Sequence, residues 1–102
     1  MKAPIEPGRV VFSKKGRDKT RYFVVLYTVD ADFVLMSDGD TRKLDHMKKK
    51  RRKHLTACPF EFPEMPQLAA EGKLKDSDIR KALDPIKQRP ESVENANSMR
   101  EG

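Results

Sequence analysis

Tyr22 to Val29 is an eight-residue run of β-branched, aromatic and aliphatic residues. Continuous apolarity of this kind is typical of a strand that bends and is covered on both faces, as in a small barrel. Alternation places Phe23 and Val25 on one face and Tyr22 and Val24 on the other, and both faces stay candidates for the interior. Because only 36% of the 102 residues are hydrophobic, the core must be small.

Short apolar segments bounded by turn residues surround this run and predict further strands. Asp38-Gly39 between two of them is a strong hairpin signal, and Gly16 in the first loop favours a turn. The expected strands are Arg9–Phe12, Phe33–Met36, Thr41–Asp45 and His54–Ala57. Short strands at close spacing predict a mainly β fold, a small closed barrel over residues 5–58.

Beyond Cys58 the sequence changes character and predicts an extension over residues 59–86. Prolines 59, 63 and 66 suggest an extended connector, with a short helix possible from Met65 to Ala70. Asp76 is a suitable N-cap for a short helix over Ser77 to Leu83, which Pro85 is expected to end. Residues 87–102 are polar and without periodicity, so we expect a disordered tail.

The charge is concentrated in the first part of the chain. Up to Cys58 there are 15 Lys and Arg against 7 Asp and Glu, and beyond it 7 against 9. Like charges repel and resist burial, so these cations should lie in solvent and favour a polyanion such as RNA or DNA. The alternatives are a merely solvated surface or, for Lys48 to Lys53, a nuclear-import signal. The candidate nucleic-acid contacts are Lys14, Lys15, Arg17, Lys19 and Arg21 in the first loop, then Arg42, Lys43, Lys48, Lys49, Lys50, Arg51, Arg52, Lys53 and His54.

The two basic clusters are expected to converge on one surface of the barrel. Arg17 and Arg42 are the best candidates for specific contacts, because a guanidinium can fork onto a phosphate or stack on a base. The nearby aromatic residues can also stack on an unpaired base, although in so small a domain each is more readily explained as core. They are Tyr22, Phe23, Tyr27 and Phe33.

Other chemistries find little support in the sequence. A zinc site normally needs four ligands, whereas His46, His54 and Cys58 are the only histidines and cysteine. Asp38 and Asp40 lie in an expected turn, where aspartate is favoured for local hydrogen bonds. We therefore expect no enzyme activity, no cofactor, no small-molecule substrate and no membrane partner. The single cysteine and an amino terminus without a hydrophobic signal-peptide core predict a cytoplasmic protein, or a nuclear one if its source has a nucleus. Closed barrel edges predict a monomer.

The stretch Pro7 to Lys19, followed by Tyr22 to Leu26, resembles the KOW motif, with Gly16 as the motif glycine. The chain looks most like the small KOW-domain RNA-binding proteins of Gram-positive bacteria, relatives of a eukaryotic and archaeal large-subunit ribosomal protein. Asp76 to Leu83 is similar to that family's carboxy-terminal helix. Thr20 and Met47 depart from the family pattern, where glycine and proline are common.

This resemblance implies an SH3-like β-barrel that binds RNA without catalysis. The expected partner is ribosomal RNA or the ribosome, and the expected process is translation. Carried onto this chain, the binding residues are Lys14, Arg17, Lys19, Arg42, Lys43 and the run from Lys48 to His54. A KOW-type transcription-elongation factor and a barrel-type protein-interaction module, in which Ile79, Ala82 and Leu83 dock a partner helix, are the alternatives.

Overall fold

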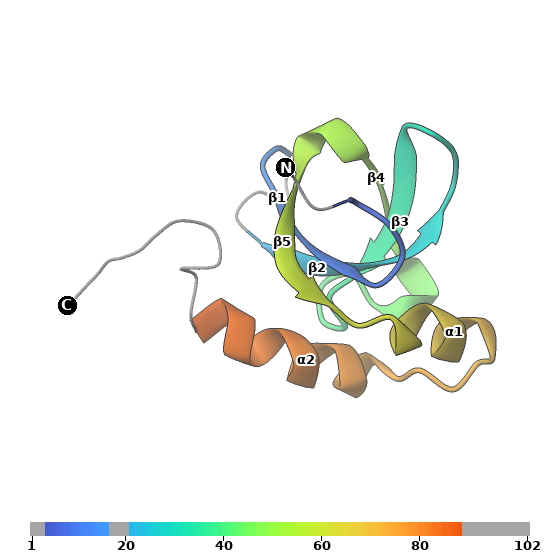
Figure 1. Cartoon of the computed structure of the whole chain (residues 1–102). Helices are drawn as coiled ribbons and strands as arrows, with labels where there is room; N and C mark the ends of the chain where they lie inside the picture. The colour runs from blue at the N-terminus through green and yellow to red at the C-terminus, as the bar shows by residue number, and fades with distance from the viewer. Residues whose placement is uncertain (1–3, 17–20, 89–102) are drawn as a thin grey trace.

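The computed structural model describes residues 4–16 and 21–88 as one antiparallel sheet with two helices (Figure 1). The strands lie in the order β4-β3-β2-β1-β5. They are β1 (Arg9–Ser13), β2 (Tyr22–Thr28), β3 (Phe33–Ser37), β4 (Lys48–Arg51) and β5 (Leu55–Glu61). The small, mainly β class predicted from the sequence is confirmed.

The predicted closure of the barrel is not observed in the described part of the chain. β4 pairs only with β3 and β5 only with β1, so the sheet stays open between its edge strands. The short 3-10 turn η2 (Arg52–His54) joins the two edges. Because η2 leads the chain directly from β4 into β5, the two edge strands are joined through the backbone although they do not pair with each other.

The fourth strand differs from the predicted one. Thr41–Asp45 was expected to return along β3, but this segment is a turn followed by a 3-10 helix, η1 (Leu44–His46). Asp38 causes the difference, since its Oδ1 accepts hydrogen bonds from Asp40 N and Arg42 N at 2.9 and 2.8 Å. These bonds hold the backbone in a local turn and delay the returning strand until Lys48.

Both faces of β2 are buried, which explains the unbroken apolarity of its sequence. Phe23 and Val25 belong to a core inside the curved sheet, together with Val34 and Met36 of β3. The alternate residues of β2 belong to a second core, on the side that carries the helices: Tyr22, Val24 and Leu26. The sequence left the choice of interior face open because neither face is exposed.

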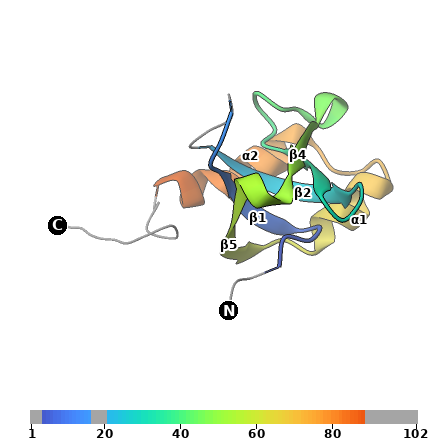
Figure 2. The ribbon, with the colours of Figure 1, turned by 90° about the horizontal axis from the view of Figure 1, so that it is seen from above.

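The helices α1 (Glu64–Ala70) and α2 (Asp76–Gln88) cover this second face of the sheet. Figure 1 shows both on one side of the strands, and Figure 2 shows the strands overlying them from above. Their buried side chains join the second core: Met65, Ile79, Leu83 and Ile86. Residues 59–86 are therefore packed with the strands, and β5 continues past the expected boundary at residue 58.

α2 passes through Pro85, where it was expected to end. A proline inside a helix costs about 3 kcal/mol, whereas burial of an isoleucine side chain contributes about 1.5–3 kcal/mol. Ile86 is 5% exposed and packs in the second core, so its burial offsets much of the cost of continuing. Lys87 and Gln88 of the predicted tail thus belong to α2, and residues 89–102 lie outside the described part.

α2 also holds the loop between β3 and β4. Arg80 Nη1 donates to Gly39 O at 2.6 Å, and Leu44 N donates to Asp76 Oδ1 at 2.8 Å. Gly39 has a φ of +73° and lies directly against the backbone of Asp76. The loop that carries Arg42 and Lys43 is consequently fixed to the helix side of the molecule.

Candidate nucleic-acid interface

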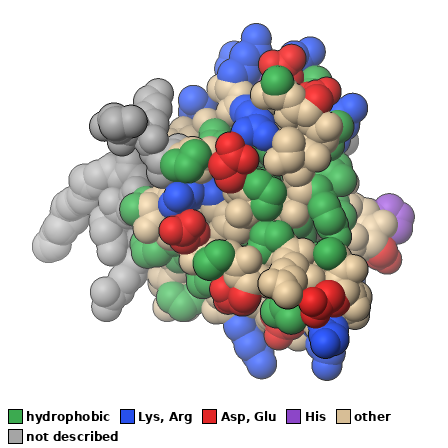
Figure 3. All heavy atoms as spheres, turned by 45° about the vertical axis from the view of Figure 1, so that its right-hand side comes forward, with side chains coloured by type: hydrophobic (Ala, Val, Ile, Leu, Met, Phe, Trp, Pro, Cys, Tyr) green, Lys and Arg blue, Asp and Glu red, His purple; other side chains and the backbone are tan. Residues whose placement is uncertain are grey.

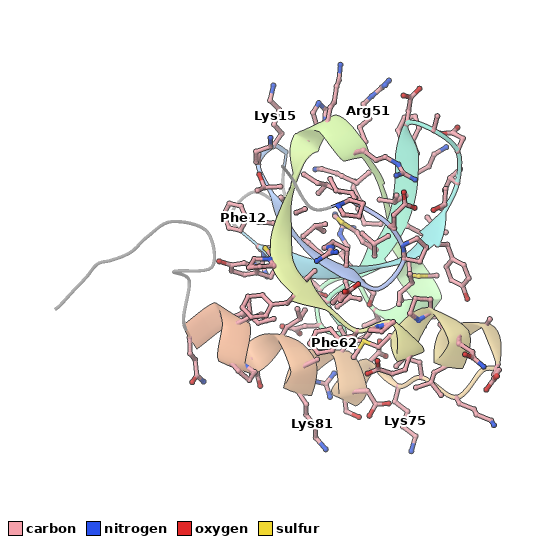
Figure 4. The ribbon with its side chains drawn as sticks, in the orientation of Figure 1. Phe12, Lys15, Arg51, Phe62, Lys75 and Lys81 are labelled. Carbon is pink, nitrogen blue, oxygen red and sulfur yellow. The ribbon has the colours of Figure 1, made fainter. Side chains whose placement is uncertain are left out.

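The first loop and the turn η2 lie together at one end of the sheet. Lys14 N donates to His54 O at 2.9 Å, and Ser13 pairs in register with Leu55. Figure 4 shows Lys15 and Arg51 projecting from this same end. The side chains of Lys14, Lys15, Arg51 and Lys53 are exposed there. We call these four residues, together with His54, the cationic end; for its members, the predicted convergence of the two clusters is observed.

β4 divides its own cations between the two faces of the sheet. Lys48 and Lys50 lie opposite Met36 and Val34, which belong to the inner core. Lys49 and Arg51 alternate with them and therefore occupy the outer face. Four consecutive cations thus do not form one uniform patch.

On the outer face, Lys49 and Arg51 share one aromatic neighbour. Lys49 Nζ lies 4.8 Å and Arg51 Cζ 4.7 Å from the centroid of the Phe33 ring. Cations at such distances are attracted by the negative face of the ring. Phe33, one of the candidate stacking residues, therefore serves in this structure as a partner of two cations.

Lys50 holds the first loop in place. Its side chain is 8% exposed, and Nζ donates to Lys15 O at 2.6 Å. Gly16, the motif glycine, has a φ of +82°, and a β-carbon there would lie 3.0 Å from Lys50 Nζ. Lys50 and Gly16 thus shape the loop that presents Lys14 and Lys15. Because its ammonium is committed to a carbonyl inside the molecule, Lys50 is a supporting residue.

Arg52 is directed toward the amino-terminal segment. Its Nη1 donates to Ile5 O at 2.7 Å and lies 3.7 Å from Glu6 Oε2, while Nη2 donates to Thr28 Oγ1 at 3.4 Å. The backbone N–H of Arg52 also donates to Asp32 O. This guanidinium therefore fastens the chain before β1 to the end of β2.

The cations around His54 lower its affinity for a proton. Partial desolvation lowers the pKa of His54 below 6.5, and the charges of Lys15, Lys53, Lys50 and Arg51 lower it further. These residues come from the first loop, β4 and η2, so their charges act on the same point. At neutral pH we expect His54 to be unprotonated in the free protein.

The remaining predicted contacts lie elsewhere or outside the described residues. Arg42 and Lys43 precede η1, which is bonded to α2, so they do not join Lys48–Lys53 as predicted. Arg21 lines a hollow with Lys87, a cation that sequence reasoning assigned to the tail. The helical spacing of Ile79, Leu83 and Ile86 was the signal that could have placed Lys87 on α2. Arg17 and Lys19 lie outside the described part of the chain.

Basic side chains are separated on the surface by an apolar region. Figure 3 shows Lys and Arg side chains at the top and bottom of one face, and hydrophobic side chains over much of its middle, mixed with acidic and some basic side chains. A groove of about 300 Å³ lies near this region, lined by residues that include Tyr27, Leu44, Met47 and Leu74.

Over 4–16 and 21–88, no group of three His, Cys, Asp or Glu side chains is placed to hold a metal ion. Cys58 is buried, and desolvation raises the pKa of its thiol to about 11. The helices in this part of the chain lack the length and apolar character needed to cross a membrane.

Comparison with models of protein families and with curated protein sequences finds no match for this chain.

Proposed function

We propose that the protein is a non-catalytic RNA-binding protein that associates with the ribosome through ribosomal RNA phosphates and acts in translation. The observation that carries the proposal is the cationic end, where exposed Lys and Arg side chains from two separate segments meet. Phosphate contacts supply most of the affinity of such surfaces and depend strongly on salt. RNA of either strandedness presents phosphates to such a surface.

The finer fold assignment is part of the same proposal. A curved antiparallel sheet of five short strands around an apolar core supports an SH3-like, KOW-type domain. The resemblance from Pro7 to Leu26 covers β1, the first loop and the start of β2, and that loop presents Lys14 and Lys15. In this reading, the KOW loop and the η2 turn form one binding edge.

Preorganisation is the mechanism by which this edge would recognise RNA. The bond from Lys50 Nζ to Lys15 O and the bond from Lys14 N to His54 O hold the loop before any ligand arrives. Binding then requires less ordering of the backbone, which favours affinity. The long lysine side chains stay free to follow the phosphates, whose spacing varies with RNA shape.

Charge reversal with a matched control tests the proposal. Lys15→Glu/Lys53→Glu changes the cationic end, whereas Lys75→Glu/Lys81→Glu changes two exposed lysines on the helix side (Figure 4). Both variants have the same net charge. We expect the first to abolish RNA retention in a filter-binding assay at low salt and the second to keep most of it. Equal losses in the two variants would contradict a localised interface.

Sedimentation in a sucrose gradient tests the ribosomal partner. The protein should travel with ribosomal fractions at low salt and leave them as salt rises, since about 0.7 counterions are released per single-stranded phosphate neutralised. RNA binding combined with persistent absence from these fractions would favour a transcription-elongation factor of the KOW type. The rival protein-interaction module loses its expected docking face, because Ile79 and Leu83 are fully buried.

A further inference from the structure

A hollow of about 400 Å³ lies between the start of β2 and the end of α2. It is lined by Arg21, Tyr22, Asp38 and Lys87. Among the described lining residues, two cations from segments distant in sequence lie beside one carboxylate, so these side chains together carry one net positive charge. A single phosphodiester, with its one negative charge, would balance it.

Backbone hydrogen bonds link Arg21, which lines the hollow, to the cationic end. Ser13 N donates to Arg21 O at 2.9 Å, and the next residue, Lys14, donates its N–H to His54 O at 2.9 Å. Arg21 is thus two backbone hydrogen bonds away from the η2 turn. A strand of RNA held at the cationic end therefore has a short path to the hollow.

Tyr22, which lines the hollow, is in contact with the aromatic ring of Phe12 on β1. The rings of Phe12 and Tyr22 have centroids 5.1 Å apart with an interplanar angle of 59°. Tyr22 is buried and lines the hollow, whereas Phe12 is only partly buried and projects from the strands below Lys15 (Figure 4). An aromatic ring beside phosphate-binding cations is the combination that proteins use to hold unpaired bases.

Asp38 does not prevent an anion from binding in this hollow. Its carboxylate already accepts hydrogen bonds from Asp40 N, Arg42 N and Thr41 Oγ1, at 2.8–2.9 Å. The charge of Lys87 also acts on this carboxylate. The negative charge of Asp38 is therefore spread over several donors, and Arg21 and Lys87 together outweigh it.

We propose that this hollow takes one unpaired nucleotide of the bound RNA, with its phosphate between Arg21 and Lys87 and its base against the accessible part of the Phe12 ring. The inference rests on the proposed function and adds to it a single-stranded segment beside the cationic end. It also gives α2 a direct part in binding, because Lys87 is in the last turn of that helix.

The test compares Lys87→Gln with Lys81→Gln, both exposed positions on α2 that lose one charge without disturbing the core. The probes are a short polyuridine strand and an RNA duplex of equal length, and affinity is measured by fluorescence anisotropy across a salt series. Lys87→Gln should weaken binding of the single strand several-fold and reduce its salt slope by about 0.7. Lys81→Gln should leave both unchanged, and neither variant should weaken duplex binding.

Phe12→Leu supplies the second measurement, since it removes the ring and keeps an apolar side chain. Loss of one stacked base should weaken binding of the single strand by about tenfold and leave the duplex unaffected. A circular-dichroism spectrum and a melting curve would show whether Phe12→Leu is folded. If Phe12→Leu does not fold, the comparison of Lys87→Gln with Lys81→Gln alone tests the inference. If Lys87→Gln and Lys81→Gln bind the single strand with the same affinity, this inference is overturned and the proposed function is not. Wild-type protein that binds neither RNA overturns the proposed function as well.

Discussion

Two glycines with the same backbone conformation allow a direct test of how α2 is attached. Gly39 and Gly72 both have a φ of +73°. A β-carbon at Gly72 would meet nothing within 4 Å, so alanine there should cost only the left-handed conformation, about 1 kcal/mol. At Gly39 the same atom would overlap Asp76 O and lie 3.2 Å from Ile79 Cβ. Forcing an atom into a packed contact costs about 1–3 kcal/mol more.

Urea denaturation at neutral pH measures both losses in the free energy of unfolding. With a slope of about 1–3 kcal/mol per molar urea, the additional 2 kcal/mol or so should lower the midpoint of Gly39→Ala by about 1 M relative to Gly72→Ala. An unchanged slope would show that the comparison concerns stability alone. Equal midpoints would mean that α2 does not pack against the β3–β4 loop as the structure places it.

Two further predictions follow from titratable side chains. Burial alone would raise the pKa of Asp38, but hydrogen bonds from the Arg42 and Asp40 backbones and from Thr41 lower it below 3.8 overall. Because the folded-state pKa is lowered, ionised Asp38 stabilises the protein above pH about 4, and this contribution is lost as the pH falls through the folded-state pKa. Asp38→Asn should therefore make the stability of the protein depend less on pH in the acid range. An unchanged curve of stability against pH would refute this. For His54, NMR titration should give a midpoint below 6.5 in the free protein, rising when RNA phosphates neutralise the surrounding cations; a midpoint unaffected by RNA would place His54 outside the interface.

Local sequence patterns predicted most of the sheet because its strands obey simple rules of burial. β1, β2 and β3 end within one residue of the predicted limits. β4 was missed because Lys48–Arg51 has no apolar residue; it pairs with β3 through backbone hydrogen bonds and through the contacts of Lys49 and Arg51 with the Phe33 ring. The strand was predicted around the apolar Leu44 instead, but Leu44 packs against the second core, on the side of the helices. Strand assignment by apolarity fails where the neighbouring strand supplies all the hydrophobic contacts.

The positive charge of the candidate site could be predicted from the sequence, but the different roles of its individual cations could not. The concentration of Lys and Arg in the sequence predicted the cationic end, but sequence could not distinguish Lys50 and Arg52 from their neighbours. Their roles depend on carbonyl groups of Lys15 and Ile5, which are distant in sequence and come close only through the fold. Lys87 was missed for a similar reason, because Arg21, which lines the same hollow, is distant in sequence and directly precedes β2.

The different roles of these side chains explain how a small fold accommodates six adjacent cations. Alternation along β4 sends neighbouring charges to opposite faces, which increases their separation relative to a helix or a tight turn. Lys50 and Arg52 are then neutralised in part by backbone carbonyls, and Lys49 and Arg51 by the Phe33 ring. The charges of Lys15, Lys50, Arg51 and Lys53 still act together on His54, where the first loop and η2 meet. A polyanion bound there would relieve the repulsion among these cations, which is the contact that the proposed function requires.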